Sequence, residues 1–349
     1  MVEQRANALG LGRTLRVLTM QILANTRASA HDSRRPKTEY GEALSSEHSD
    51  QADDWTQHKS ASAAIQSALG GTLASRYAQE LSGCSLTLAL ELLHDGAGRL
   101  RPWSRCKRRW CPVCSWRLSL QRWGQLSERL PALLQQQQGK VSWLMLTLTV
   151  RNCRTDDLRS EVGRLLKGFT NLRRRQAWPA TAWLRALEIT FPREGEAHPH
   201  IHVLLAVKPS YFKKAYLSHA TWQSMWRESA GLDYDPIVDV RRVKPLRERP
   251  VGMPESAAEA LGGAAEVSKY VVKPEDLSAK KDVGVVISAM AALKGRRLVD
   301  AGGWLRGIFS EHDDDAQQDE LPEVETVAAF TWRAAESLYR RNLEEKAPR

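Results

Sequence analysis

The chain contains 349 residues, enough to bury a substantial core and to form two or three domains. Its formal net charge is +10 and its isoelectric point is near 9.5, which predicts a polyanionic partner. No apolar run approaches the ~20 residues that a membrane-spanning helix needs, and the N-terminus lacks a signal-peptide pattern. We therefore expect a cytoplasmic protein with no membrane partner.

The first 60 residues have the composition of a mostly disordered basic and polar region. Ser, Ala, Asp, His and Arg recur there without a sustained period. Such a segment cannot bury enough apolar area to offset the entropy of ordering. A helix is predicted over residues 61–81, at the start of a cysteine-rich module that extends to residue 125.

Four of the five cysteines have the spacing of a metal site. Cys111 and Cys114 form a Cys-x2-Cys knuckle, and Cys106 and the more distant Cys84 complete a set of four thiolates for tetrahedral Zn²⁺. A redox-active Cys-x2-Cys is the alternative, but no thioredoxin-like βαβ pattern surrounds it. We expect structural zinc in a reducing compartment, with Cys153 an ordinary thiol at the end of a strand.

Basic and aromatic side chains are interleaved with these cysteines, the aromatic ones being Trp110, Trp116 and Trp123. Clustered cations bind phosphates and aromatic rings stack on bases, so this module is predicted to contact DNA. The candidate DNA-binding residues are Arg105, Lys107, Arg108, Arg109, Arg117 and Arg122.

Residues 140–307 alternate between strand and helix patterns. In residues 143–150 every second side chain is Leu or Val, which predicts a half-buried strand with one polar face. The expected order is strand 143–150, helix 158–172, strands 183–191 and 200–207, helix 211–227, strand 236–243 and helix 256–272. This order predicts an α+β domain with an antiparallel sheet of four to five strands in a split βαβ layout, with helices on one face.

Three alternate histidines lie in one of these strands. Because residues two apart share a face, His198, His200 and His202 can point the same way. A hairpin centred near Gly195 would place Glu188 opposite His202, whereas a slip of one residue would move it to the other face. Imidazoles and a carboxylate suit Mn²⁺ or Mg²⁺. A lone histidine is more often structural, but this group predicts a metal site.

A tyrosine with charged neighbours lies about seventy residues further along the chain. On a helix Glu266, Tyr270 and Lys273 share one face. A cation such as Lys273 favours the phenolate, and a metal on a phosphate makes its phosphorus a better target. The alternative is a packing tyrosine between exposed charges. Together with the histidines, this group predicts cleavage of a phosphodiester by tyrosine.

The last segment, residues 308–349, is predicted to be an acidic linker followed by an amphipathic helix over residues 327–343. The acidic residues could mimic nucleic acid and restrain the basic site. A solvated spacer is the favoured interpretation.

The chain resembles the rolling-circle plasmid replication initiators (Rep proteins) of the HUH endonuclease superfamily, in the class with a single catalytic tyrosine. The resemblance covers roughly residues 84–306, and neither tail matches it. It rests on Cys111–Arg117, Leu146–Val150, His198–His202, Trp222 and Trp226, Tyr234 and Pro236, Glu266–Lys273, Lys294–Leu298, and Gly302 with Gly303.

The resemblance implies a role for each matching residue. His200 and His202 would coordinate the divalent cation, with Glu188 as third ligand and His198 as an auxiliary. Tyr270 would attack the origin phosphate, leaving a 5′-phosphotyrosine and a 3′-OH that primes synthesis. A second set of roles concerns termination and partners: Glu266 would activate water, and the partners would be double- and single-stranded origin DNA with a host helicase and DNA polymerase.

Three alternatives remain open. A relaxase or a single-strand transposase of the same superfamily would use the same chemistry, although a relaxase usually places its tyrosine before the histidines. A non-catalytic DNA-binding repressor would not need intact His-x-His and Glu-x3-Tyr motifs. A homodimer is one allowed state that the sequence does not decide.

Overall fold

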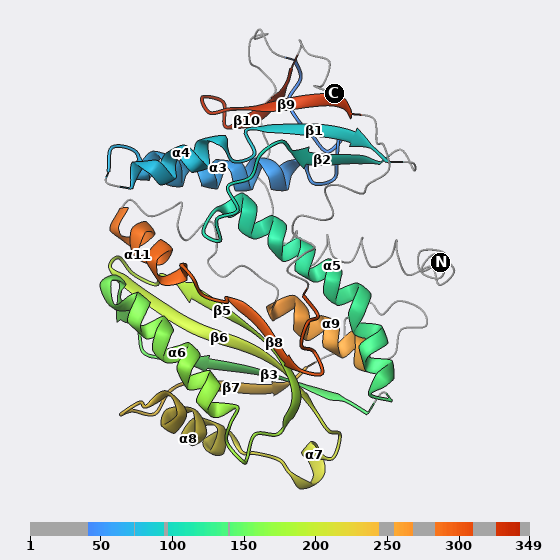
Figure 1. Ribbon diagram of the computed structural model, residues 1–349, viewed down its shortest axis with the longest axis vertical. Helices are drawn as coiled ribbons and strands as arrows, with labels where there is room; N and C mark the ends of the chain where they lie inside the picture. The colour runs from blue at the N-terminus through green and yellow to red at the C-terminus, as the bar shows by residue number, and fades with distance from the viewer. Residues whose placement is uncertain are drawn as a thin grey trace.

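The computed structural model describes residues 41–72, 74–93, 97–138, 140–243, 255–267, 283–309 and 326–342. In this part of the chain two antiparallel sheets combine with helices in an α+β fold (Figure 1). The helices are α3 (Ala52–Leu69), α4 (Ser75–Gly83), α5 (Pro112–Gln136), the 3-10 turn η1 (Thr155–Asp157), α6 (Leu158–Leu172), α7 (Tyr211–Lys214), α8 (His219–Ala230), α9 (Glu255–Val267) and α11 (Val283–Leu293). The strands are β1 (Thr87–Leu92), β2 (Gly98–Pro102), β3 (Ser142–Thr149), β4 (Cys153–Arg154), β5 (Ala180–Thr190), β6 (Glu196–Val207), β7 (Val238–Arg242), β8 (Val299–Gly303), β9 (Thr326–Arg333) and β10 (Leu338–Arg341).

The larger sheet has the strand order β7-β3-β6-β5-β8, and β4 pairs with β6 outside this path. The predicted strands 143–150, 183–191, 200–207 and 236–243 are confirmed as β3, β5, β6 and β7, within a few residues at each end. The helix predicted over 158–172 is confirmed as α6. The edge strand β8, which the sequence analysis did not predict, pairs with β5.

Helices cover both faces of this sheet, so the expectation of helices on one face is wrong. One face packs against α6 and α8, and the other against α9 and the second half of α5 (Figure 1). The reason is that the supposed polar face is apolar along half of its length: Met145 and Leu204 are 3% and 1% exposed. Helix α9 lies so close that a Cβ on Gly263 would approach Leu204 Cδ1 to 2.5 Å.

The smaller sheet has the order β10-β9-β1-β2 and packs with α3 and α4. The helix predicted over residues 327–343 is wrong, because the chain forms the hairpin β9–β10 there. Phe330 and Trp332 alternate inward along β9 and pack near Tyr339, whose hydroxyl donates to Ser85 O at 2.6 Å. The acidic residues of the expected linker lie within 310–325, outside the described residues.

The structure has two helices where a single helix was predicted over residues 61–81, and their bounds differ from the predicted ones. Helix α3 begins at Ala52 and ends at Leu69, and α4 follows after a turn in which Gly71 has φ +75°. Residues 41–60 are therefore part of the fold: Trp55 is fully buried, and Ala43 bridges Arg340 of β10. Residues 1–40 lie outside the described part.

Of two further predicted helices, one is divided and the other is described only in part. The helix expected over 211–227 divides into α7 and α8, because Ser218 caps a new helix by accepting from Thr221 N. The helix expected over 256–272 is described as α9 up to Val267, and the residues that follow lie outside the described part. Within the described residues, no helix has the length and apolarity to cross a membrane.

Helix α5 joins the two halves of the molecule (Figure 1). Its first turn carries Cys114 at the smaller sheet, and its second half packs beside α9 on the larger one. The cysteines and the histidines are thus held on one connected framework.

Candidate functional site

The hairpin β5–β6 brings Glu188 to the histidines, but in a different register from the predicted one. Glu188 lies opposite His200, and Ala186 lies opposite His202. The expected pairing of Glu188 with His202 is therefore wrong. The residue opposite Glu188 is two positions earlier than predicted, so Glu188 still lies on the same face of the sheet as the histidines. Glu188 is consequently in contact with both histidines.

The three side chains converge through defined atoms. His202 Nε2 lies 3.0 Å and His200 Nε2 lies 3.5 Å from Glu188 Oε2. The other ring nitrogens have partners of their own: His202 Nδ1 is 3.1 Å from Thr147 Oγ1, and His200 Nδ1 is 3.2 Å from His198 O. With the protons on Nδ1, both Nε2 lone pairs and the carboxylate face one point.

This donor set fits a divalent cation. The ligand atoms of Glu188, His200 and His202 all lie within 4.8 Å of one another and are half-buried or buried. Burial opposes ionisation of Glu188, but hydrogen bonds and attraction from His200 and His202 more than offset it and hold its pKa well below the usual range. The carboxylate is ionised, as a metal ligand must be.

His198, the predicted auxiliary, lies outside this trio. It occupies the same face and its ring stacks on that of His200, with centroids 5.2 Å apart. Burial, with the neighbouring His200, lowers the pKa of His198. A neutral ring that packs on a ligand can orient it.

Helix α9 runs along the same face toward this trio. Near its start, Trp143 Nε1 donates to Ser256 O at 2.9 Å, and further along Gly263 lies against Leu204, two residues from His202 on β6. The helix therefore proceeds from the far end of the sheet toward the histidines. Glu266 belongs to its last turn.

Tyr270 and Lys273, the predicted nucleophile and its cationic neighbour, lie outside the described residues. In the sequence Tyr270 follows Val267, the last described residue of α9, by three positions.

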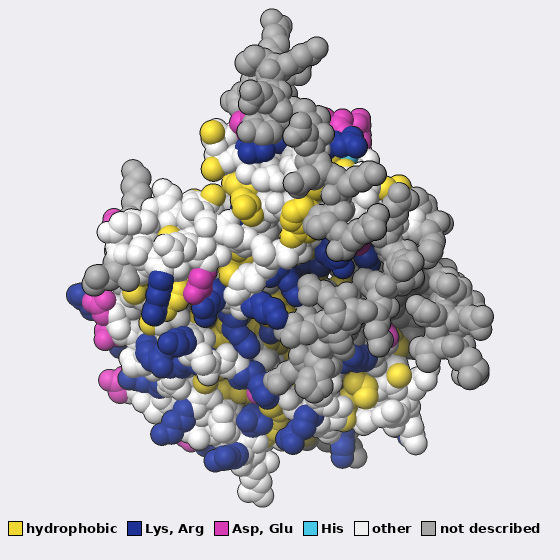
Figure 2. Space-filling view, turned by 45° about the horizontal axis from the view of Figure 1, so that its top comes forward, with side chains coloured by type: hydrophobic (Ala, Val, Ile, Leu, Met, Phe, Trp, Pro, Cys, Tyr) yellow, Lys and Arg dark blue, Asp and Glu magenta, His cyan; other side chains and the backbone are white. Residues whose placement is uncertain are grey.

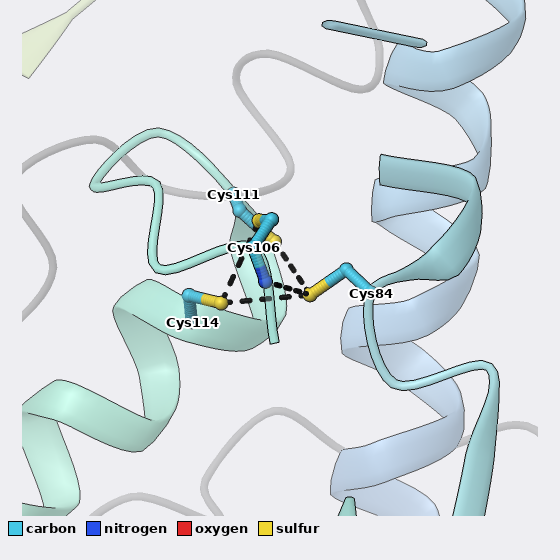
Figure 3. Close-up of side chains that lie close together, drawn as sticks. All are labelled: Cys84, Cys106, Cys111 and Cys114. Atoms are coloured by element: carbon cyan, nitrogen blue, oxygen red, sulfur yellow. Dashed lines mark hydrogen bonds between the residues drawn. The ribbon is translucent and has the colours of Figure 1, made fainter. Parts of the chain in front are cut away.

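The four predicted cysteines come together at the junction of α4, β2 and α5 (Figure 3). Cys84 Sγ lies 3.7 Å from Cys111 Sγ and 3.5 Å from Cys114 Sγ, and Cys106 Sγ lies 3.7 Å from Cys114 Sγ. A ZnS₄ tetrahedron with Zn–S bonds of ~2.3 Å has edges of ~3.8 Å. The sulfur positions match the ligand set of a tetrahedral zinc site. Cys153 is half-buried in β4, away from them.

A buried lysine that the sequence analysis did not identify supports the cysteine cluster. Lys59 on α3 is 2% exposed, and its Nζ donates to Cys84 O at 2.5 Å and to the carbonyls of Leu81 and Ser82. Burial lowers its pKa, and the four sulfurs oppose that effect. Four thiolates bound to Zn²⁺ would carry net negative charge, and the positive charge of Lys59 lies close enough to offset part of it. No sequence signal links Lys59 to cysteines 25 or more positions away.

The basic residues around the cysteines are placed less uniformly than predicted. Lys107, Arg108 and Arg109 are exposed in the loop before α5, although Arg108 pairs with Glu80 at 2.6 Å. Arg117 packs over the Trp55 ring at 5.3 Å, and burial lowers its pKa to about 10. Arg105 and Arg122 are half-buried.

The tryptophans interleaved with these cations are buried. Trp110, Trp116 and Trp123 are 8%, 2% and 6% exposed, so they stabilise the module instead of offering rings to bases. The DNA-binding role of the six cations remains a prediction, which now depends on the exposed loop residues.

Loss of metal should loosen the cysteine module. We expect one zinc per chain and, for Cys111→Ser, loss of that zinc with a large fall in Tm, because structural zinc contributes folding free energy directly. Metal content and calorimetry measure both. Cys153→Ser is the matched control and should change neither. A Cys111→Ser protein with unchanged Tm, from a wild type that holds no zinc, would remove this assignment.

Fold and site together define a class: an α+β protein with a His-His-Glu trio on one sheet and a four-cysteine cluster beside a second. A sequence model of the family Rep_1, described as "Replication protein", matches residues 97–340. That is more than half of the chain, so this protein belongs to the Rep_1 family of replication proteins.

Curated relatives support this membership. "Protein rep" of Bacillus amyloliquefaciens is 34% identical over 279 residues, which cover 75% of this chain and 81% of that protein. "Protein rep" of Streptococcus pneumoniae serotype 2 is 34% identical over 238 residues, or 66% of this chain and 70% of the relative. No solved structure matches the chain. The family match reaches residue 340, so β9 and much of β10 belong to it, beyond the limit of residue 306 expected from the motifs.

Proposed function

We propose that this protein initiates rolling-circle replication of a plasmid by nicking one strand at its double-strand origin. The observation that carries the proposal is the Glu188, His200 and His202 trio, on a face along which α9 runs toward it. In a replication protein, a cation site of this kind suits cleavage of a DNA phosphodiester, and Tyr270, which follows α9 in the sequence, is the proposed nucleophile.

The nicking step exchanges one ester for another. The Tyr270 oxygen would bond to phosphorus while the bond from phosphorus to the 3′-oxygen breaks, leaving a 5′-phosphotyrosine and a 3′-OH that has gained a proton. A bound Mg²⁺ or Mn²⁺ would withdraw charge from the phosphate oxygens. The protein's own contribution is to position the phosphate and to hold His200 and His202 by their Nδ1 hydrogen bonds. Lys273 would stabilise the phenolate or the departing oxygen.

A plasmid assay tests this function. Supercoiled plasmid carrying the origin is incubated with the whole protein and Mn²⁺ or Mg²⁺. We expect relaxed circles with protein attached to the 5′ end, and none in EDTA. Circles cut without attached protein, or cut equally well in EDTA, would contradict the proposal. In the cell, the free 3′-OH left by nicking would be extended by a host polymerase behind a host helicase.

Glu266 is proposed to close the cycle as a general base for water. For Glu266→Ala we expect initial nicking to continue while release of the 5′-linked product slows by roughly 10²–10⁴-fold, the usual contribution of a positioned base. Product release is followed as loss of the covalent protein–DNA band. Glu259→Ala, on the same helix, is the control and should leave release unchanged. Equal loss of nicking and release would exclude a separate termination role.

A further inference from the structure

A cluster of arginines lies at the β8 edge of the larger sheet and has no part in the chemistry proposed above. Arg185 on β5 pairs with Asp300 on β8 at 3.5 Å, and Arg297 pairs with the same carboxylate at 3.4 Å. Arg173, at the end of α6, lies over the Trp183 ring at 4.5 Å and close enough to Asp300 and Arg306 to feel both charges. The arginine cluster comprises Arg173, Arg174, Arg185, Arg297 and Arg306.

The guanidiniums of this cluster lie close to one another. Two of them, those of Arg185 and Arg297, share the carboxylate of Asp300. Burial lowers the pKa of Arg185 to about 10, partly offset by Asp300, and the neighbouring Arg173 and Arg297 lower it further. Arg185 is 7% exposed, and its Nη1 has no hydrogen-bond partner among the described residues. Guanidiniums packed this closely attract an anion.

The outer members of the cluster are accessible to such an anion. Arg174, Arg297 and Arg306 are exposed. Figure 2 shows Lys and Arg side chains gathered across the half of the molecule that contains the larger sheet, with few acidic side chains between them. A broad positive face suits an extended polyanion better than a small ion.

One end of the cluster comes near the trio at the edge of the sheet. Arg185 is an odd number of residues from Glu188 on β5, so it faces the opposite side of the sheet, where it packs against Phe169. Leu187 N bonds to Leu298 O at 2.9 Å, however, which places Arg297 at the sheet edge beside Glu188. Two strand spacings separate this edge from β6 and its histidines, roughly 10 Å. A DNA strand with one phosphate at the trio can therefore pass around the β8 edge and place neighbouring phosphates on the arginines there.

We propose that the arginine cluster binds the sugar–phosphate backbone of the origin DNA next to the nick. The identity of the DNA rests on the proposed function, whereas the binding itself does not. Arg174, Arg297 and Arg306 would contact phosphates. Arg173 and Arg185 would act as positioning residues that keep the surface positive and hold Asp300 and Arg297 in place.

The test compares two triple variants that remove the same charge. The first is Arg174→Gln with Arg297→Gln and Arg306→Gln. The control is Lys140→Gln with Lys208→Gln and Lys213→Gln, three exposed lysines that lie near the ends of β3 and β6 opposite the histidines and are not part of the arginine cluster. Binding of labelled origin duplex is measured by fluorescence anisotropy over a salt series in EDTA, so that no cleavage contributes.

Each lost phosphate contact should reduce the slope of log affinity against log salt by about 1. We expect the arginine variant to lose about 2 to 3 from that slope, with affinity at least about tenfold weaker, and the lysine control to lose less than 1. Equal slopes in the two variants, at equal Tm, would overturn the proposal.

Nicking by the wild type is scored separately on plasmid. If the wild type does not nick but the two slopes differ as expected, the binding surface is supported and the proposed function fails. If the wild type nicks but the two slopes are equal, the proposed function is supported and the binding surface fails.

Discussion

Replacing Tyr270 by phenylalanine is expected to abolish nicking and the covalent protein–DNA product together. The substitution removes one oxygen, the atom that would bond to phosphorus, and leaves the ring. Because the substitution removes the proposed nucleophile itself, the loss should be at least about 10⁴-fold, as for other removed nucleophiles. The measurement is plasmid relaxation with Mn²⁺, followed by a denaturing gel for the 5′-linked protein.

The matched control is Tyr216→Phe. Tyr216 is 63% exposed, follows α7 in the sequence and is not part of the trio. Its replacement should therefore leave nicking unchanged. DNA affinity in EDTA should be the same in both variants. Normal nicking by Tyr270→Phe would mean that another residue is the nucleophile.

The half of the fold that contains the larger sheet was largely predictable because its signals are local. The alternation in β3 and the helical spacing in α6 each lie within one element, and both elements form as expected. The order of the elements then limits the topology to a few sheets. The four-cysteine cluster was predictable for a similar reason, since three of its cysteines lie within nine residues of sequence, from Cys106 to Cys114.

The errors arose where the outcome depends on distant partners. Residues 327–341 are compatible with either a helix or a hairpin on their own, and pairing with β1, more than 230 residues earlier, selects the hairpin. The far side of the larger sheet was mistaken for a polar face because α9 and α5, which bury Met145 and Leu204, come from separate parts of the chain. Lys59 and the arginine cluster are likewise tertiary features.

The predicted register of the β5–β6 hairpin is wrong, yet Glu188, His200 and His202 still come together. The turn is centred one residue earlier than expected, so every partner moves by two and every face is preserved. Glu188 reaches His202 diagonally and His200 directly. A carboxylate in contact with both histidines is better placed to share a cation with them than one opposed to a single ring.

The trio leads to the second large effect, that of His202→Ala. Loss of one of three protein ligands should weaken binding of the cation and remove several kcal/mol of charge stabilisation, so we expect nicking to fall by at least about a hundredfold. His200→Ala should behave in the same way, because its Nε2 faces the same carboxylate oxygen. The measurement is the nicking rate at a series of Mn²⁺ concentrations.

The same series distinguishes a ligand from a neighbour. His198 stacks on His200 but lies outside the trio, so His198→Ala should need only moderately more Mn²⁺ and should recover most of the rate when Mn²⁺ is in excess. His202→Ala should not recover, since its site lacks a donor. If His198→Ala is as inactive as His202→Ala, His198 is itself a ligand. If His202→Ala nicks at the wild-type rate in limiting Mn²⁺, the trio is not the cation site. The proposed activation of the phosphate by a cation held there would then be wrong.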